Sequence, residues 1–419
     1  MRTITFKGLF LTVLFVLLGS LAIQAADDGL ITKQITIKLD EAGTLPDRIG
    51  ESKKYLITNL KIVGEVNGTD WRFIREMAGR DYHGLETVGK LSILDLSDAK
   101  IVEGGSEYIS YYGGKYTSND KLGDYAFYGC SGLTSLTIPS SVTSIGEAAF
   151  NGCSGLTSLT IPSSVTSIGK GAFYGCSNLT SLTIPSSVIS IGSSAFYGCS
   201  GLTSLTIPSS VTSIGNSAFL GCSSLTSLTI PSSVTSIGDD TFRDCSGLTS
   251  LTISSGVTSI GISAFEGCSS LTSLTIPSSV ISIGLGAFRY CSSLTSLTIP
   301  SSVILIDYFA FSDCSGLTSI YVYPEKIPKL GGTVFDGCDA KNCTVYVPIG
   351  TYDDYRSSEF GYFENIKEFD ATGINKVTTS TDAKELSRYS ANGQRLSAPA
   401  KGLNIVKYSD GSVKKVAVQ

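Results

Sequence analysis

The sequence predicts a repeat solenoid, a rod or arc of stacked coils that each add one strand to a parallel β-sheet. Two observations predict this fold. The string LTSLTIPSSVTSIGEAAFNGCSG begins at Leu133 and recurs almost unchanged every 23 residues as far as Val322. A fixed period in the twenties is typical of proteins in which each repeat forms one coil and stacks on the next. Caps at both ends and a small C-terminal antiparallel β module complete the expected architecture.

Residues 1–25 have the pattern of a secretory signal peptide. Arg2 and Lys7 precede an apolar run, and small residues around Ala25 offer a cleavage site. The run is too short for a transmembrane helix, and no other stretch qualifies as a transmembrane segment. We therefore expect export, followed by secretion or display at the cell surface, with a mature chain that begins near Ala26.

Composition argues against a nucleic-acid partner. The 419 residues carry a formal net charge of −5, and only 16% of them are charged. Nucleic-acid binding needs a basic surface that neutralises phosphates. Length alone suggests about two or three globular domains, but a repeat array grows without one large core.

Residues 26–125 are predicted to form an N-terminal cap with two irregular leucine-rich coils. Their apolar residues keep the spacing of such coils, with Ile57, Leu60 and Ile62 in the first and Leu91, Leu94, Leu96 and Ile101 in the second. A helix is expected between them, with Thr69 or Asp70 as its N-cap and Gly79 at its end. An atypical end segment is expected because a solenoid exposes apolar surface at its open ends.

A glycine-rich segment, residues 103–121, interrupts this cap with four tyrosines, Tyr108, Tyr111, Tyr112 and Tyr116. Two interpretations remain open. The segment is an aromatic binding loop, since loops often carry function, or it is a flap that packs on the first coil.

Residues 126–348 form the array proper, in which the repeats align with one another. Residues 135–138 (SLTI) alternate polar and apolar side chains, which predicts a strand with one buried face. Pro139 cannot donate to a strand ladder and therefore ends this strand. Residues 142–145 predict a second short extended piece, and Phe150 with its equivalents plugs the far side of each coil.

Nine of the eleven cysteines occupy one position of the repeat: Cys130, Cys153, Cys176, Cys199, Cys222, Cys245, Cys268, Cys291 and Cys314. Stacked coils place them in a column with a spacing of about 4.8 Å and parallel side chains. A disulfide needs converging Cβ atoms roughly 3.5–4.5 Å apart, so we expect buried free thiols that act as small apolar groups. Cys338 and Cys343, beyond the strict repeat, are the candidate disulfide pair.

The array is expected to end with a strand at residues 343–348 and a capping helix within residues 349–370. Thr351 is the predicted N-cap of this helix, and Asp353 and Asp354 lie near its positive end. Aromatic side chains of the helix are expected to close the last coil.

Two further segments follow. Residues 371–385 are predicted to form a linker. Residues 386–419 are predicted to form a small antiparallel β module, because Asn392-Gly393 and Asp410-Gly411 each lie between two alternating runs. Both dipeptides are strong hairpin signals.

The outward positions of the predicted strands form a uniform hydroxyl face. Its candidate ligand residues are Ser135, Thr137, Ser158, Thr160, Ser181, Thr183, Ser204 and Thr206. Such a face suits a repetitive or extended partner that is held by many weak contacts. It suits a passive spacer equally well, and both interpretations remain open.

Sequence variation is concentrated beside the phenylalanine plug instead. One variable position holds tyrosine in three of its first four copies, at Tyr128, Tyr174 and Tyr197. Together with Tyr108, Tyr111 and Tyr112 of the N-terminal cap, these are the aromatic candidates for ligand contact.

No catalytic, cofactor-binding or metal-ligating pattern is recognisable. A Ser-His-Asp or Cys-His site would need His83, the only histidine, and a lone loop histidine is far more often a packing residue. Asp239, Asp240 and Asp244 share one coil, but calcium takes about six to eight oxygens and neighbouring coils supply no aligned carboxylates. We expect a non-enzymatic protein without a cofactor.

The coil L-T-S-L-T-I-P-S-S-V-T-S-I-G-x-x-A-F-x-G-C-S resembles the BspA-like, or Treponema-type, leucine-rich repeat, and the resemblance covers residues 126–322. The segments on either side are similar to those that flank such arrays in Bacteroidetes proteins. The resemblance implies a leucine-rich-repeat fold in a secreted or surface-exposed protein, and some members bind extracellular-matrix proteins or other bacteria. The end module is similar to C-terminal sorting domains of type IX secretion.

The resemblance and the missing catalytic pattern lead to one functional hypothesis and one rival. The hypothesis is an adhesin-type protein whose partners are extracellular-matrix or cell-surface (glyco)proteins of a host or of other bacteria. The rival is a structural spacer or stalk with binding confined to its caps and loops.

Overall fold

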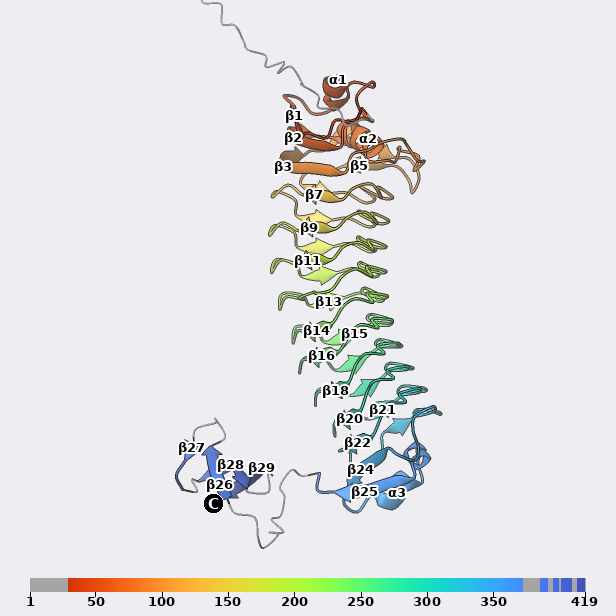
Figure 1. The fold of residues 1–419 in the computed structure, drawn as a ribbon, viewed down its shortest axis with the longest axis vertical. Helices are drawn as coiled ribbons and strands as arrows, with labels where there is room; N and C mark the ends of the chain where they lie inside the picture. The colour runs from red at the N-terminus through yellow and green to blue at the C-terminus, as the bar shows by residue number, and fades with distance from the viewer. Residues whose placement is uncertain (1–28, 372–384, 391–394, 399–400, 409–412, 419) are drawn as a thin grey trace, which may run out of the picture.

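The computed structural model describes residues 29–371, 385–390, 395–398, 401–408 and 413–418. Figure 1 shows a long rod of parallel coils between an N-terminal and a C-terminal cap, which confirms the predicted solenoid. The predicted signal peptide and most of the predicted linker lie outside the described residues. Within the described part, no helix has the length and apolarity that a membrane span needs.

The first side of the rod carries one strand from almost every coil, and these strands are parallel. They are β1 (Ile35–Lys38), β2 (Asn59–Val66), β3 (Ile93–Ile101), β7 (Ser135–Thr137), β9 (Ser158–Thr160), β11 (Ser181–Thr183), β14 (Ser227–Ile230), β16 (Ser250–Ile253), β18 (Ser273–Thr275), β20 (Ser296–Ile299), β22 (Ser319–Val322), β24 (Thr344–Pro348) and β25 (Asn365–Phe369). Register follows the repeat, so Leu136 lies opposite Leu159. We call this side the strand face.

A second side is built from much shorter parallel strands. They are β6 (Lys121–Leu122), β8 (Ser144–Ile145), β10 (Ser167–Ile168), β12 (Ser190–Ile191), β13 (Ser213–Ile214), β15 (Ser236–Ile237), β17 (Ser259–Ile260), β19 (Ser282–Ile283), β21 (Leu305–Ile306) and β23 (Lys329–Leu330). These strands confirm the second extended piece that the sequence predicted. Each coil is therefore a flattened turn around one apolar core.

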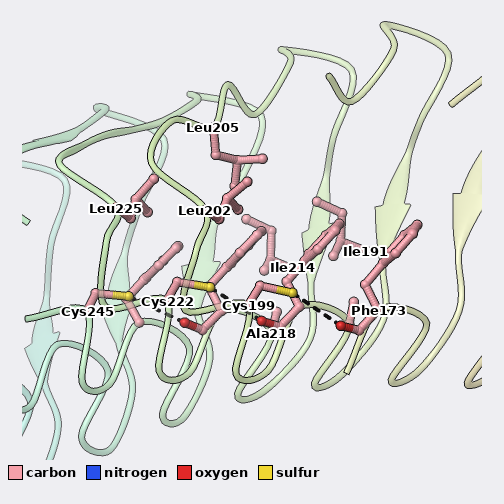
Figure 2. Packing of buried hydrophobic residues seen from close by; sticks show 14 of the residues in the cluster. Phe173, Ile191, Cys199, Leu202, Leu205, Ile214, Ala218, Cys222, Leu225 and Cys245 are labelled. Atoms are coloured by element: carbon pink, nitrogen blue, oxygen red, sulfur yellow. Dashed lines mark hydrogen bonds between the residues drawn. The ribbon is translucent and has the colours of Figure 1, made fainter. Parts of the chain in front are cut away.

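The third side, which we call the plug corner, has turns instead of strands but is still hydrogen-bonded from coil to coil. The Phe150 N–H donates to the Ala172 carbonyl at 2.7 Å, and each following coil repeats this bond. The phenylalanine rings stack along the rod, for example Phe173 on Phe196 with centroids 5.1 Å apart and planes 3° from parallel. Figure 2 shows these rings beside the cysteine column in the interior of the coils.

The N-terminal cap contains two elements that the sequence did not predict, the strand β1 and the short helix α1 (Leu45–Ile49). The predicted helix is present as α2 (Gly68–Met77), but its N-cap is Asn67 and not Thr69 or Asp70. Asn67 accepts from the Thr69 N–H at 3.0 Å, and the Asp70 carboxylate accepts from the Asn67 N–H. The predicted N-cap therefore lay two or three residues too late. Asp70 does take part in capping, but as the partner of Asn67 in a capping box.

Side chains of this cap replace the hydrogen-bond donors that a preceding coil would supply. The Trp71 indole N–H donates to the Ala126 carbonyl at 3.1 Å, and the buried Arg75 guanidinium donates to the carbonyls of Tyr125 and Ala126. The Tyr108 hydroxyl donates to the Asp124 carbonyl at 2.8 Å. The first coil of the array is therefore closed at the plug corner by side chains in place of backbone.

The segment with four tyrosines contains a hairpin of β4 (Gly104–Ile109) and β5 (Lys115–Thr117). Tyr108 is only 1% exposed and belongs to the core, whereas Tyr112 is 55% exposed. The flap interpretation therefore holds for Tyr108, and the candidate role of Tyr108 in ligand contact is wrong. Tyr112, four residues later in the same segment, lies at the surface.

The C-terminal cap differs from the single predicted helix. It contains α3 (Tyr352–Arg356), a 3-10 turn at Glu359–Tyr362, and the strand β25, which pairs with β24. The last strand is therefore β25 and not the one at residues 343–348. Thr351 precedes α3 as predicted, but its hydroxyl donates backwards to the Pro348 carbonyl and does not cap the helix.

All eleven cysteines are buried free thiols, as predicted for the column. From Cys153 to Cys338, each thiol of the column donates to a phenylalanine carbonyl of an earlier coil, as Cys199 does to Phe173 at 3.2 Å (Figure 2). The expected disulfide between Cys338 and Cys343 is absent. Cys338 continues the column and donates to the Phe311 carbonyl, while Cys343 is buried just before β24, so the two thiols serve different parts of the core.

The C-terminal module is an antiparallel sheet with the strand order β27-β26-β28-β29. Its strands are β26 (Glu385–Ser390), β27 (Arg395–Leu396), β28 (Gly402–Tyr408) and β29 (Val413–Val418). Pairing of β26 with β27 and of β28 with β29 confirms both predicted hairpins. The Asn392-Gly393 and Asp410-Gly411 dipeptides lie outside the described residues.

Candidate functional site

The hydroxyl face lies on the solvent side of the strand face, as the alternating pattern predicted. Thr137, Ser158, Thr160, Ser181, Thr183, Ser204 and Thr206 are exposed, and Ser135 is half-buried. A neighbouring threonine column is tied to the backbone, since the Thr180 hydroxyl donates to the Thr157 carbonyl at 3.3 Å. The surface is chemically uniform along its length.

This face is not continuous. Residues 204–206 form only an isolated bridge from Ser204 to Ser181, and no strand pairing joins them to β14. Recesses of about 150 and 360 Å³ open on the two sides of Thr206. The second side is interrupted in the same coil, because β13 and β15 belong to separate sheets.

A serine with a buried hydroxyl group lies in the same coil. The Ser187 and Ser233 hydroxyls each donate to a valine carbonyl of the preceding coil at 2.6 Å, but the equivalent Ser210 hydroxyl is buried without a partner. The plug corner stays intact there, since the Phe196 N–H donates to the Ala218 carbonyl at 2.7 Å. The coil is therefore held mainly through its plug corner.

Aromatic side chains gather at the plug corner of the first coils. We call Tyr112, Tyr125, Tyr128, Tyr174 and Tyr197 the tyrosine edge. The rings of Tyr174 and Tyr197 stack with centroids 4.4 Å apart and planes 7° from parallel, and Tyr174 is 39% exposed. Partial burial of Tyr174 raises its pKa, to which the neighbouring Tyr197 contributes.

The hairpin of the N-terminal cap extends this edge. The Tyr112 ring stacks on Tyr125 at 4.4 Å and meets Tyr128 edge-on at 6.1 Å. Burial raises the pKa of Tyr125 to about 12, and the nearby Glu147 carboxylate adds to this shift. A tyrosine hydroxyl carries no charge in its ordinary protonated form, so the edge presents aromatic rings and hydroxyls.

Later copies of the same repeat position are charged and internally paired. Arg243 lies 3.3 Å from Asp240 and 3.7 Å from Glu266 of the next coil. Arg289 lies 3.5 Å from Asp313 and over the Tyr290 ring. The two halves of one column therefore differ, with aromatic rings in the first and ion pairs in the second.

Other predicted positions are accounted for by local contacts. His83 Nδ1 lies 2.9 Å from the Ser110 hydroxyl. Tyr111 is half-buried against the core between Tyr112 and Tyr128. The side chains of Asp240 and Asp244 pair with Arg243, and the described residues contain no group of three or more potential metal ligands.

A groove that the sequence did not predict lies near the C-terminal cap. Its volume is about 570 Å³, and its lining includes Ile304, Tyr323, Pro324, Ile327 and Pro328. Ile304 is 64% exposed and replaces a threonine of the consensus coil. The apolar substitution was visible in the sequence, but its position beside the irregular loop was not.

The comparisons agree with this architecture. A family model described as BspA type leucine rich repeat region (6 copies) matches residues 120–249 and 235–360, together more than half of the chain. The chain is similar to a leucine rich repeat protein of T. pallidum, at 33% identity over 37% of this chain and 72% of that one, with a TM-score of 0.35.

The chain is also similar to two further solved structures. A leucine-rich repeat protein from Bacteroides ovatus is 23% identical over 69% of this chain and 86% of its own, with a TM-score of 0.43. A leucine rich cell surface protein from Faecalibacterium prausnitzii is 22% identical over 80% and 87%, with a TM-score of 0.36. No curated protein matches the chain in sequence. The repeat, its coil geometry and the family match lead to one conclusion: the chain belongs to the BspA-type leucine-rich repeat family.

Proposed function

We propose that this protein is an exported, surface-located adhesin-type protein, and that it binds matrix or cell-surface (glyco)proteins through its tyrosine edge. Solenoids of stacked repeats are typical binding scaffolds, because they present long surfaces on a rigid frame. The single observation that carries the proposal is a pair of tyrosine stacks on the first coils, Tyr112 on Tyr125 and Tyr174 on Tyr197, each with one exposed ring.

Tyrosine suits such a contact for a physical reason. It buries a large apolar area with little loss of conformational freedom, and its hydroxyl keeps a hydrogen bond at the rim. The tyrosine edge is half-exposed, and the charged second half of the same column is already paired within the chain. Unpaired recognition groups therefore concentrate toward the N-terminal end of the rod.

The rival function is a spacer or stalk. One observation favours it: the hydroxyl face hardly varies, although outward strand positions are where ligand-specific leucine-rich proteins are expected to vary. Under this alternative, the array only holds the caps apart.

Binding assays with paired variants test the proposal. The full chain, a Tyr112→Ala/Tyr174→Ala variant and a Thr160→Val/Thr183→Val variant would be tested on immobilised fibronectin, on laminin and on bacterial cells. We expect the tyrosine variant to lose at least about 10-fold in affinity and the threonine variant to keep it. Loss only in the threonine variant would move the site to the hydroxyl face, and no binding by the unmodified chain would support the spacer.

The C-terminal module has a separate proposed role as a sorting segment for type IX secretion. Two observations support this role: the module is a sheet of two hairpins, and its last strand carries the basic residues Lys414 and Lys415. Cells that express residues 1–385 should retain the protein in the periplasm. Normal surface display of that truncation would contradict this role and leave the binding proposal untouched.

A further inference from the structure

We propose that the position of Asn151 in the tyrosine edge is a binding site for one pyranose unit of a glycan. This inference rests on the proposed function and names the chemistry of its partner. Tyr128, Asn151, Tyr174 and Tyr197 occupy one repeat position in four successive coils. Asn151 is the only one of the four without an aromatic ring, so it interrupts the column.

The interruption has a defined width. Tyr174 and Tyr197 show that rings at this position lie across the rod axis and stack along it, with planes 7° from parallel. Tyr128 and Tyr174 are two coils apart, a separation of about 10 Å at the usual strand spacing. A six-membered ring in the place of the missing tyrosine would lie between the coil of Tyr128 and the ring of Tyr174. The exposed fraction of Tyr174, 39%, agrees with an uncovered face.

Polar side chains belong to the same coil and to the next one. Asn151 is half-buried, and within the described residues its side-chain amide makes no hydrogen bond. Glu147 and Lys170 lie on the same corner, four residues before Asn151 and Tyr174. Glu147 already accepts a bond from the Tyr125 hydroxyl at 3.4 Å, and Lys170 is exposed. These two coils therefore carry an amide, a carboxylate and an ammonium group on the same corner as the tyrosine column.

This combination fits a sugar ring better than an aromatic side chain. A pyranose has apolar C–H faces that pack on tyrosine rings and a rim of hydroxyls that both donate and accept. A phenylalanine or tyrosine in the same place would cover the Asn151 amide without satisfying it, and an unsatisfied polar group is costly to bury. Ligand sites with mostly aromatic walls and a few placed polar groups follow the same logic.

The ring orientation also fixes the direction of the glycan. Because the Tyr174 ring stacks along the rod axis, a pyranose that packs on it has its edge toward solvent, and the rest of the glycan extends outward from that edge. Only one unit is then held per molecule. We therefore expect weak binding of single sugars, with a dissociation constant on the order of 1–10 mM, and strong binding only to surfaces that carry many copies.

Saturation-transfer NMR on the full exported chain tests this inference. The probes are the methyl pyranosides of glucose, galactose, mannose and N-acetylglucosamine, and N-acetyl-tyrosinamide serves as the aromatic competitor. Asn151→Tyr fills the gap with the residue that three neighbouring coils already use, so this variant keeps the fold. We expect at least one pyranoside to bind, and N151Y and Y174A each to weaken it at least about 10-fold. Tyr308→Ala, a change at another exposed tyrosine of the plug corner, is the control and should leave binding unchanged.

Three results would overturn the proposal: no pyranoside binds at about 10 mM, N151Y binds as well as the unmodified chain, or the tyrosine derivative binds more tightly than every sugar and is lost in N151Y. The last result would identify a protein side chain as the ligand. Cell binding that survives N151Y, when sugar binding does not, would show that the glycan site does not carry cell adhesion, and it would leave the broader adhesin proposal standing.

Discussion

The strand face and the plug corner of each coil differ in both uniformity and cohesion. Outward strand positions repeat serine and threonine almost without change, yet their ladder is interrupted at residues 204–206 and again between β16 and β18. The plug corner varies from coil to coil, yet its hydrogen bonds and ring stack run on through the coil of residues 202–224. Cohesion and sequence variation therefore occur on the same side of this protein, and the regular β-ladder is the weaker of the two sides.

The largest effect is expected from truncating two core side chains, one in the plug corner and one beneath the strand face near residues 204–206. Phe196→Ala removes a buried ring from the stack and should cost about 3–5 kcal/mol of unfolding free energy. Leu205→Ala removes a side chain beside the two recesses and should cost about 2–3 kcal/mol. Urea unfolding followed by far-UV circular dichroism measures both. Equal losses would contradict the greater cohesion of the plug corner.

Alkaline pH tests the thiol column of the plug corner. Burial raises the pKa of Cys199 and of Cys245 to about 12. Unfolded thiols ionise first, so this stabilisation is complete below about pH 8.5 and is lost as the pH rises toward 12, at up to about 1.4 kcal/mol per pH unit for each thiol. A Cys199→Ser/Cys245→Ser variant keeps a donor at each site but does not ionise there. Its stability should fall less steeply from pH 9 upward, and an unchanged slope would refute the explanation.

A smaller effect concerns backbone strain at the plug corner. Ser194 has φ of 54°, in the left-handed region, and Gly171 occupies the same position one coil earlier. Ser194→Gly relieves strain but adds entropy to the unfolded chain, so we expect a net gain of about 0.5–1 kcal/mol. A shift of the urea midpoint to a higher concentration checks it. Ser193→Gly, at the neighbouring residue without positive φ, is the control and should not stabilise.

The smallest effect is expected on the strand face. Thr183→Val changes an exposed hydroxyl and should alter stability by less than about 0.5 kcal/mol. Thr180→Val removes the bond to the Thr157 carbonyl and should cost about 0.5–1 kcal/mol. Thermal unfolding separates the two variants. A large loss from Thr183→Val would show that the hydroxyl face contributes to the fold after all.

The repeat period made the core of the array predictable from sequence, because near-identical coils can only stack with like residues in columns. Elements outside the period were missed: β1 and α1 precede any recognisable repeat, and β25 follows the last one. The prediction for Tyr108 was wrong because its hydroxyl donates to the Asp124 carbonyl of the first coil, and its ring is buried there. That contact becomes visible only when the coil's hydrogen bonds are known.

The candidate site was predictable in part. Comparison of repeats pointed to the column of Tyr128, Tyr174 and Tyr197, and the structure adds the stacking of Tyr112 on Tyr125. The interruption at Ser210 was not predictable, because the sequence of that coil matches its neighbours. Identical residues bond differently there, so only the three-dimensional arrangement distinguishes this coil.

The cysteine column gives every coil of the array its own chemical reporter. A thiol reagent in solution can reach Cys222 only when the coil around it opens, because the native side chain is fully buried. Rates of alkylation, resolved by mass spectrometry for each cysteine, would therefore give a profile of local opening free energy along the rod without any engineered label. In such a profile, the coil of residues 202–224, where the strand on the first side is missing, should react ahead of its neighbours.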